Sequence, residues 1–468
     1  MTMKAVNPVT SETIKEYDEM SAAEVRGIIE KAHEAFLTWR ETSLDARADR
    51  MRQAAQTLRN GADQYARLMA EEMGKPITGG RAEAQKCAWA CDYFADNAAQ
   101  FLQPETIETD AAKSYVTFEP IGVVLAIMPW NFPFWQVFRF AAPALMAGNA
   151  ALLKHASNVP GCALAIEEIF HVSGFPENLF RAILIGADDT KKVIANPLVR
   201  AVTLTGSTRA GRAVASASGE ALKKTVLELG GSDAYLILED ADVASAAATC
   251  AASRLINSGQ SCINAKRFIV VESVRREFEE AFVARMRAAK VGDPLDETTE
   301  VGPLARKDLR EALHDQVRKS INGGARLLLG GKIPDGDGTY YPPTVLTDVK
   351  PHTPAYDEEL FGPVAAIIPV KDEDEAIRVA NDSPYGLGAA VFTRDIARGE
   401  RIAAKLLDAG ACFVNAFVRS DPRLPFGGVK ESGYGRELSS YGIKEFVNIK
   451  TVYVASSPDA PTGARTSE

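Results

Sequence analysis

The sequence predicts an α/β protein built around a doubly wound, largely parallel sheet. Apolar runs typical of buried strands recur at residues 123–127, 150–153, 181–185, 201–204 and 225–227. Stretches with the helical spacing of apolar residues lie between them, and the repeat of roughly 20 to 30 residues is that of successive strand–helix–strand units. Strands joined in this way run parallel, and helices cover both faces of the sheet.

The first hundred residues precede this sheet and are expected to be helical. Ser21 and Glu24 form a capping box, after which apolar residues recur at helical spacing. Gly74 ends a later helix, and residues 81–101 are expected to form another.

A second series of strands begins near Phe268 and indicates a second α/β domain. Its further apolar runs lie at residues 326–329, 364–369, 389–392 and 412–415. Cys262 falls near the join between the two series, where clefts commonly form.

Two segments outside these series alternate between apolar and polar residues like exposed strands. They are residues 115–118 and 447–454, and an exposed edge of this kind needs a partner. Residues 458–468 show no apolar periodicity and are expected to form a mobile tail.

Composition excludes several classes of function. The 468 residues are 46% hydrophobic and 25% charged, ordinary values for a folded protein of two or three domains. A net charge of −9 and scattered basic residues offer no surface for nucleic acid. The chain has no uncharged run of the 18 or so residues that suggest a membrane helix, and its first residues lack the apolar core of a signal peptide. We therefore expect a cytoplasmic protein without a nucleic-acid or membrane partner.

One of the six cysteines stands in a context that suggests chemistry. Six are too few for a disulfide framework in so long a chain, and Cys87 and Cys91 have no histidine near them that would indicate a metal site. Cys262 follows glycine, glutamine and serine in a polar turn and precedes an apolar strand. A thiol in such a turn is held for reactivity more often than for packing, with a buried structural thiol as the alternative.

Two further residues offer groups that a reactive thiol needs. A thiol of ordinary pKa, about 8.5, must lose its proton to attack, which a base or N–H donors can assist. Glu228 ends an apolar run, so its carboxylate is either paired or catalytic. Asn131 lies in a turn fixed by prolines, where its amide is either an ordinary turn residue or a donor to a developing oxyanion.

Two strand ends suit a phosphate-bearing cofactor. Gly206 and Ser207 follow one strand and open a helix, whose free N–H groups attract phosphate. The segment lacks the usual glycine-rich fingerprint, so an ordinary turn capped by Ser207 is the alternative. Lys154 ends another strand at the edge where open α/β sheets bind ligands, and a solvated strand end is its alternative.

Six motifs in order resemble the aldehyde dehydrogenase superfamily, over roughly residues 5 to 455. They are PWNFP at 129–133, TGS at 205–207, ELGG at 228–231, GQSC at 259–262, ELFGP at 359–363 and PFGGVKESG at 425–433. Chance agreement of six such segments is negligible.

The resemblance implies a role for each of these segments. Cys262 is expected to be the nucleophile, Glu228 the general base and Asn131 the oxyanion donor. The expected cofactor contacts are Met128, Trp130, Lys154, Ser157, Gly206, Ser207, Glu359 and Phe361, with Glu359 on the nicotinamide ribose. The implied reaction is the NAD(P)-dependent oxidation of an aldehyde to a carboxylic acid through a thiohemiacetal and a thioester on Cys262, without a metal.

The position of Ser157 bears on the choice of cofactor. Some family members carry a glutamate there, which holds the adenosine ribose and repels a 2′-phosphate. Serine beside Lys154 removes that repulsion, so NADP is the expected cofactor and NAD the alternative.

Within the family, the chain is similar to the succinate-semialdehyde dehydrogenase branch. That substrate carries a carboxylate, for which the resemblance implies contacts from Arg139 and Ser420 in a site that also includes Trp135 and Ser261. A surface salt bridge is the alternative for Arg139. Some of these enzymes carry a second arginine where this chain has Ile256, so other semialdehydes and medium-chain aldehydes stay open as substrates.

The resemblance also implies how the chain is divided and assembled. Residues 1–101 and 121–230 are expected to form a Rossmann-like dinucleotide-binding domain, and residues 231–440 the catalytic domain. Residues 102–120 and 441–457 are expected to form a small β extension that assembles a homodimer or homotetramer.

Two other classes of function compete with this reading. One is a CoA-acylating dehydrogenase, against which Glu228 argues because such enzymes generally dispense with the base. The other is a non-enzymatic binding protein, whose sign would be loss of the thiol, the amide or the base.

Overall fold

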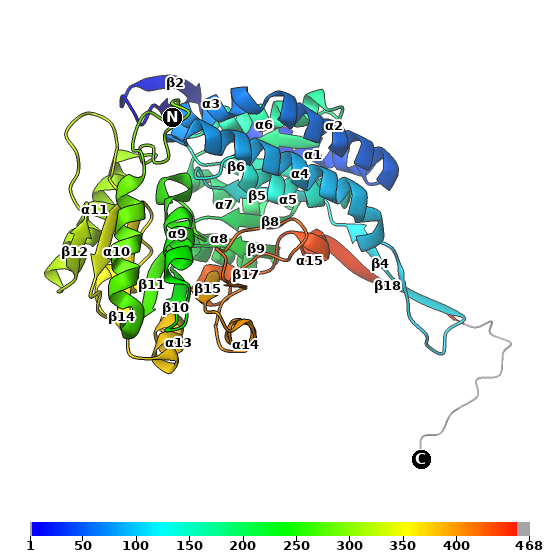
Figure 1. Cartoon of the computed structure of the whole chain (residues 1–468). Coiled ribbons are helices and arrows are strands. Elements are labelled where there is room, and N and C mark those ends of the chain that lie inside the picture. Colours follow the sequence, from blue (N-terminus) through cyan, green and yellow to red (C-terminus); the bar gives the residue numbers. More distant parts are fainter. Residues whose placement is uncertain (1, 456–468) are drawn as a thin grey trace, which may run out of the picture.

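The computed structural model describes residues 2–455, in which two sheets form the centres of two α/β parts (Figure 1). The predicted tail at residues 458–468 lies outside the described residues. No helix within residues 2–455 combines the length and apolar character that crossing a membrane requires.

The first part contains a six-stranded sheet with the order β17-β9-β8-β5-β6-β7. Its strands are β5 (Val123–Met128), β6 (Ala150–His155), β7 (Phe180–Ala182), β8 (Val199–Thr205), β9 (Lys224–Glu228) and β17 (Gly433–Tyr434). The strands β5 to β9 are parallel, and β17 returns from the far end of the chain to pair antiparallel with β9. This arrangement confirms the predicted doubly wound fold.

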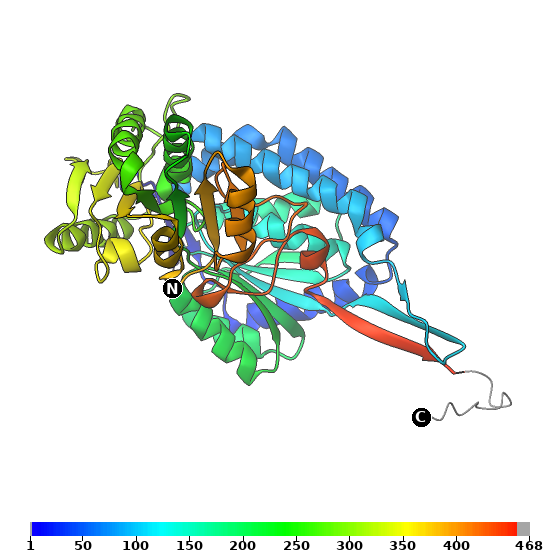
Figure 2. The same ribbon diagram turned by 60° about the horizontal axis from the view of Figure 1, so that its bottom comes forward.

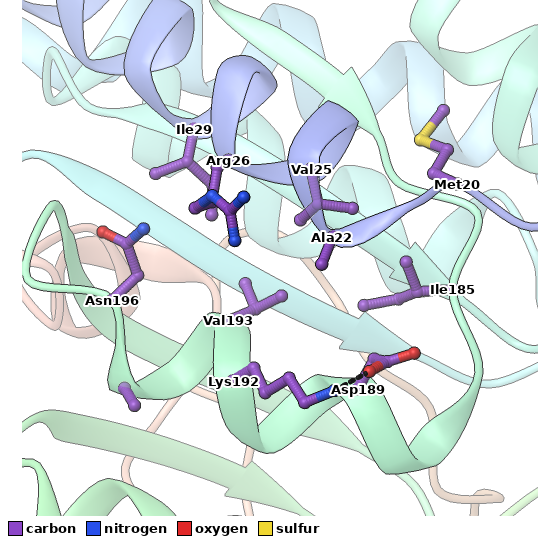
Figure 3. A pocket seen from close by; sticks show the side chains of 11 residues that line it. Met20, Ala22, Val25, Arg26, Ile29, Ile185, Asp189, Lys192, Val193 and Asn196 are labelled. Carbon is purple, nitrogen blue, oxygen red and sulfur yellow. Dashed lines mark hydrogen bonds and ion pairs between the residues drawn. The ribbon is translucent and has the colours of Figure 1, made fainter.

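Helices cover both faces of this sheet. They are α1 (Ala22–Trp39), α2 (Leu44–Asn60), α3 (Ala62–Met73), α4 (Ile77–Phe101), α5 (Trp135–Met146), α6 (Pro160–Val172), α7 (Ala187–Ala195) and α8 (Thr208–Glu220). The helices α2, α3 and α4 pack against α5 and α6, and α1 lies beside α7 (Figures 1 and 3). The predicted capping box opens α1, where the amide of Ser21 donates to Glu24 Oε2 at 2.7 Å.

The strand order reverses between β5 and β8. From β5 the chain proceeds through β6 to β7 on one side, and then crosses back to β8 and β9 on the other. The carboxyl ends of β5 and β8 therefore border the crevice in which open α/β sheets bind their ligands.

The expectation that the first hundred residues are helical is wrong at their start. Strands β1 (Thr2–Val6) and β2 (Thr13–Asp18) form an antiparallel hairpin before α1. Every residue of β2 is exposed or half-buried, so the strand has no apolar face that sequence alternation would have revealed.

The second part contains a seven-stranded sheet with the order β12-β13-β14-β11-β10-β15-β16. Its strands are β10 (Asp233–Ile237), β11 (Ala265–Val271), β12 (Arg326–Leu329), β13 (Thr344–Thr347), β14 (Val364–Val370), β15 (Gly388–Phe392) and β16 (Ala411–Val414). All are parallel except β12, which pairs antiparallel with β13. Strands β10 and β13 were missed because β10 follows β9 without the usual spacing and β13 is only four residues long.

Further helices surround this second sheet and link it to the first. They are α9 (Val243–Leu255), η1 (Ile256–Gly259), α10 (Glu272–Ala288), α11 (Lys307–Asn322), α12 (Pro354–Asp357), α13 (Glu373–Asn381), α14 (Ile396–Lys405), η2 (Lys430–Ser432) and α15 (Ser439–Ile443). The turn that carries Cys262 lies between η1 and β11.

A third, small sheet projects from the body of the molecule. It consists of β3 (Glu105–Thr106), β4 (Lys113–Pro120) and β18 (Val447–Val454) in the antiparallel order β18-β4-β3. Both views show β4 and β18 extending away from the helices as an arm (Figures 1 and 2). The strands predicted at residues 115–118 and 447–454 are thus paired with each other.

Candidate active site

A cavity of about 720 Å³ lies between the two α/β parts, and Cys262 is in its wall. Helices α4 and α5 form its side on the first part. On the second part it is bounded by residues 255–264 and 417–426. The thiol therefore faces a space of the size of a small-molecule site.

A different hollow, of about 360 Å³, lies between α1 and α7 (Figure 3). Its lining is largely apolar, with Val25, Ile29 and Val193 among its residues, and Lys192 is paired with Asp189 at 2.7 Å. No thiol or buried carboxylate faces this hollow, so we place the chemistry at the cavity of Cys262.

The turn before Cys262 is held rigidly. Gly259 has a φ of +77°, and a Cβ atom there would lie 2.2 Å from the carbonyl carbon of Gly362. The side chain of Gln260 accepts a hydrogen bond from the amide of Ala305 at 2.9 Å. Beneath the turn, Lys266 Nζ donates to the carbonyls of Ser261 and Cys262 at 2.9 and 2.8 Å. These contacts fix the backbone of the turn that carries the thiol.

The thiol of Cys262 is half-buried, and its pKa is raised. Burial raises it to about 12, with small contributions in the same direction from Glu359 and Asp233. The nearby cations Arg139 and Lys266 lower the pKa. The side chain is therefore a neutral thiol at pH 7 and needs a proton acceptor before it can attack.

Asn131 lies directly beside the turn of Cys262. Its side chain is 4% exposed, and Nδ2 donates to the carbonyl of Gln260 at 3.1 Å. The side chain of Asn257 in turn donates to the Asn131 carbonyl at 2.7 Å. One N–H of the Asn131 amide is thus used to hold the turn, which leaves the other for a ligand. The structure thus places this predicted amide against the backbone of Gln260, two residues before Cys262.

Glu228 is buried at the end of β9, but it is not among the residues that line the cavity. Burial raises its pKa well above the ordinary value, Glu437 raises it further, and Arg139 lowers it. Neither carboxylate oxygen has a hydrogen-bond partner among the described residues. A Cβ atom at Gly427 would lie 2.7 Å from Oε1, so the carboxyl group packs against the chain directly after Phe426 of the cavity wall.

Most of the residues expected at a cofactor lie along the carboxyl edge of the first sheet. Met128 ends β5, Lys154 is near the end of β6, and Gly206 follows β8. Ser207 caps α8, because its Oγ accepts a hydrogen bond from the amide of Ala210 at 3.3 Å. The capped turn that the sequence offered as the alternative to phosphate binding is therefore present. Burial lowers the pKa of Lys154, while Ser157 is exposed.

The remaining expected cofactor residues come from both parts. The rings of Trp130 and Phe361 meet edge to face, with centroids 5.7 Å apart. Glu359 Oε1 accepts from the amide of Gly231 at 3.1 Å and lies 3.5 Å from Lys266 Nζ. The segment that carries Glu359 and Phe361 thus reaches the crevice from the second part.

Arg139 is in the cavity wall, but its charge is already paired. It is 2% exposed, forms an ion pair with Glu437 and donates to Thr205 Oγ1 at 3.2 Å. The guanidinium also lies over the ring of Phe426, 4.8 Å from its centroid. The alternative of a surface salt bridge is therefore wrong, because the pair with Glu437 is fully buried.

The other expected substrate residues meet in the same cavity. Trp135 Nε1 donates to Ser420 Oγ at 3.1 Å, and both side chains are buried. Ser261 is also in the wall.

Comparison with known proteins agrees with this geometry. The model of the aldehyde dehydrogenase family matches residues 1–452. The chain belongs to the aldehyde dehydrogenase family.

Several members of this family are close in sequence. A protein of Synechocystis named as a probable NADP⁺-dependent succinate-semialdehyde dehydrogenase is 49% identical, over 97% of this chain and 100% of its own length. A succinate semialdehyde dehydrogenase of Escherichia coli, named for NAD(P)⁺, is 45% identical over 96% of this chain and 97% of its own length.

A solved structure has the same fold. The succinic semialdehyde dehydrogenase of Streptococcus pyogenes, crystallised in complex with NADP⁺, is 39% identical and superposes with a TM-score of 0.95. The comparison covers 97% of this chain and 100% of the other.

Sequence reasoning missed two lysines of this aldehyde dehydrogenase. Lys266 lies under the thiol, and Lys86 Nζ donates to Ser420 Oγ at 2.9 Å in the cavity. Lys86 and Ser420 are 334 residues apart in the chain, so no local pattern links them. The weak signal for Lys86 is that it precedes Cys87 and Ala88, two buried positions of a predicted helix.

Metal-ligand clusters are absent from the part of the chain that the structure describes. Within residues 2–455, no three histidine, cysteine, aspartate or glutamate side chains are grouped so as to hold an ion.

Proposed function

We propose that this chain oxidises succinic semialdehyde to succinate, with NADP⁺ as the cofactor. The observation that carries the proposal is the placement of Cys262 in the wall of one cavity with cationic side chains and Ser420. Such a cavity suits an aldehyde that bears a carboxylate. The names of relatives 45 to 49% identical support the same substrate and cofactor.

The residues present fit a dinucleotide cofactor. The start of α8 at Ser207 offers free N–H groups for the pyrophosphate, and Glu359 offers a carboxylate for the nicotinamide ribose. Lys154 and Ser157 carry no negative charge that would repel a 2′-phosphate, which favours NADP⁺ over NAD⁺. When bound, the cofactor supplies the acceptor for a hydride.

Cys262 and Asn131 carry out the first half of the reaction. The Cys262 thiol releases its proton to solvent water, the resulting thiolate sulfur attacks the aldehyde carbon, and the carbonyl oxygen becomes an alkoxide. The second N–H of the Asn131 side chain and the backbone N–H of Cys262 donate to that alkoxide, and such a donor is worth about 3 kcal/mol in a dry site. Loss of hydride from the same carbon leaves a thioester on Cys262.

Glu228 serves the second half as the base for water. Attack of water on the thioester releases the acid and returns the thiol. Because Glu228 is not among the residues that line the cavity, this role requires its side chain to rotate toward the thioester. Arg139 stabilises the ionised form of Glu228 and so keeps a buried carboxylate available as a base.

These roles assign a separate function to each part of the fold. We assign cofactor binding to the six-stranded sheet, the thiol to the seven-stranded part and self-association to the arm of β4 and β18. The arm presents apolar side chains such as Ile449 and Tyr453 to solvent, at 61% and 54% exposed.

The proposal is tested by mixing the protein with succinic semialdehyde and NADP⁺ in the absence of CoA. We expect NADPH to form and succinate to accumulate, and we expect Cys262→Ala to abolish both. A requirement for CoA would indicate an acylating dehydrogenase. Absence of NADPH with any aldehyde would refute the assignment.

A further inference from the structure

Lys86 occupies a defined place in the cavity of Cys262. Its ammonium donates to Ser420 Oγ at 2.9 Å and lies 4.2 Å from the centroid of the Trp135 ring. Trp135 also donates to the same hydroxyl, at 3.1 Å. The three side chains come from α4, α5 and the segment after β16, and all of them line the cavity.

The carboxylates around Lys86 are already engaged by other groups. Glu83 pairs with Lys75 at 2.7 Å and accepts from the backbone amides at the start of α5, each at 2.9 Å. Asp421 pairs with Arg423 at 2.7 Å. Among residues 2–455, the Lys86 ammonium has no carboxylate within 4 Å, although the side chain is half-buried.

Arg139, the cation that the resemblance implied for the substrate carboxylate, already has a carboxylate partner. Its guanidinium is neutralised by Glu437 and donates to Thr205. A second carboxylate at Arg139 would compete with Glu437 in a buried site, where an unpaired charge is costly.

From this contrast we infer that Lys86, together with Ser420 and Trp135, forms the subsite for the carboxylate of the substrate. The inference rests on the proposed function and names the group that recognises its substrate. The bound carboxylate accepts from the Lys86 ammonium and the Ser420 hydroxyl. Arg139 instead acts as a positioning residue for Glu228 and Glu437.

The protonation of Lys86 supports this assignment. Burial and the charge of Arg139 lower its pKa to about 8, while Cys87, Glu83 and Asp421 act in the opposite direction. Lys86 is therefore charged below about pH 8 and loses its charge above it. We expect the KM for succinic semialdehyde to rise as the pH passes 8, and the KM for the uncharged analogue butanal to lack this rise.

The variants Lys86→Met and Lys86→Arg test the subsite, with succinic semialdehyde and butanal as substrates. Removing one partner of a buried charge pair typically costs a factor of about 30 or more. We expect Lys86→Met to lower kcat/KM for succinic semialdehyde at least about tenfold more than for butanal, chiefly through KM. Lys86→Arg should recover most of the loss, and Lys31→Met, at an exposed position of α1, should behave as the wild type.

Equal losses on both aldehydes would overturn the inference, as would an unchanged KM for succinic semialdehyde. If Lys86→Met does not fold, the pH profiles of the wild type decide between the same outcomes. An inactive wild type would refute the proposed function itself, whereas an active wild type with no discrimination by Lys86 would refute only the subsite.

Discussion

At the scale of single residues, the site contains three buried ionisable side chains, of which Arg139 is in the cavity wall. Glu228 and Glu437 are both buried with raised pKa values, and Arg139 lies near both carboxyl groups and lowers both pKa values. One cation beside two carboxyl groups stabilises the first carboxylate that ionises. Ionising the second costs much more, because two negative charges then lie close together. The arrangement therefore favours the protonated form of at least one of the two carboxyl groups.

This cluster predicts how substitution of Arg139 affects catalysis. Arg139→Met leaves Glu228 without its stabilising cation, so ionisation of the base becomes harder. We expect kcat to fall by about a hundredfold or more for every aldehyde, because base catalysis contributes factors of this size. The measurement is kcat/KM with succinic semialdehyde, glutaric semialdehyde and butanal.

A different result for Arg139→Met would support the role that the resemblance implied for Arg139, which is contact with the substrate carboxylate. A loss confined to the two charged aldehydes would mean that Arg139 binds the substrate carboxylate directly. Arg139→Lys, which keeps the charge, is the matched control.

At the scale of elements, the turn between η1 and β11 is fixed by contact with the segment that carries Glu359. Gly259 makes that contact possible, because it has a positive φ and no side chain facing Gly362. The backbones at residues 259 and 362 thus pack closely, which a methyl group at residue 259 would prevent.

Substitution of this glycine should disturb both the thiol and the fold. We expect Gly259→Ala to lower the free energy of unfolding by about 2 kcal/mol or more, since the conformation is strained and the space is filled. The fall in activity should exceed the loss expected from unfolding alone. Urea denaturation and kcat/KM are the measurements, with Gly27→Ala on α1, where a Cβ meets nothing within 4 Å, as control. Equal stability of Gly259→Ala and the wild type would contradict the tight contact.

Elements with a buried apolar run or a clear alternation of apolar and polar residues could be predicted from the sequence, and others could not. The strands β5 to β9 carry apolar runs at the expected spacing, and β18 alternates although it is mostly exposed, whereas β2 has no buried residue and β13 is very short. The same limit applies to the site. Cys262 and Asn131 lie in distinctive local motifs, but Lys86 gains its meaning only from Ser420, which the fold brings beside it.

At the scale of the whole molecule, the arm of β4 and β18 leaves an edge strand uncovered. β18 pairs with β4 on one side only, and most of its residues are exposed. An edge of this length, with apolar side chains, is a template for pairing with a second copy.

Charges on this edge should therefore change the oligomeric state. We expect the wild type to be a dimer or tetramer by light scattering after gel filtration. Ile449→Lys together with Tyr453→Lys should shift it toward a smaller species, because like charges would face each other across the interface. The double variant Lys31→Glu and Lys192→Glu, on helices away from the arm, is the control. A monomeric wild type would contradict this proposal.

The central claim is that Cys262 carries the acyl group, and mass spectrometry of a trapped intermediate tests it most directly. Glu228→Gln keeps the nucleophile but removes the base for water, so the thioester should accumulate after addition of succinic semialdehyde and NADP⁺. We predict one NADPH per active site in a rapid burst and a succinyl group on the peptide that contains Cys262. An unmodified Cys262 peptide during continued NADPH formation would contradict the account.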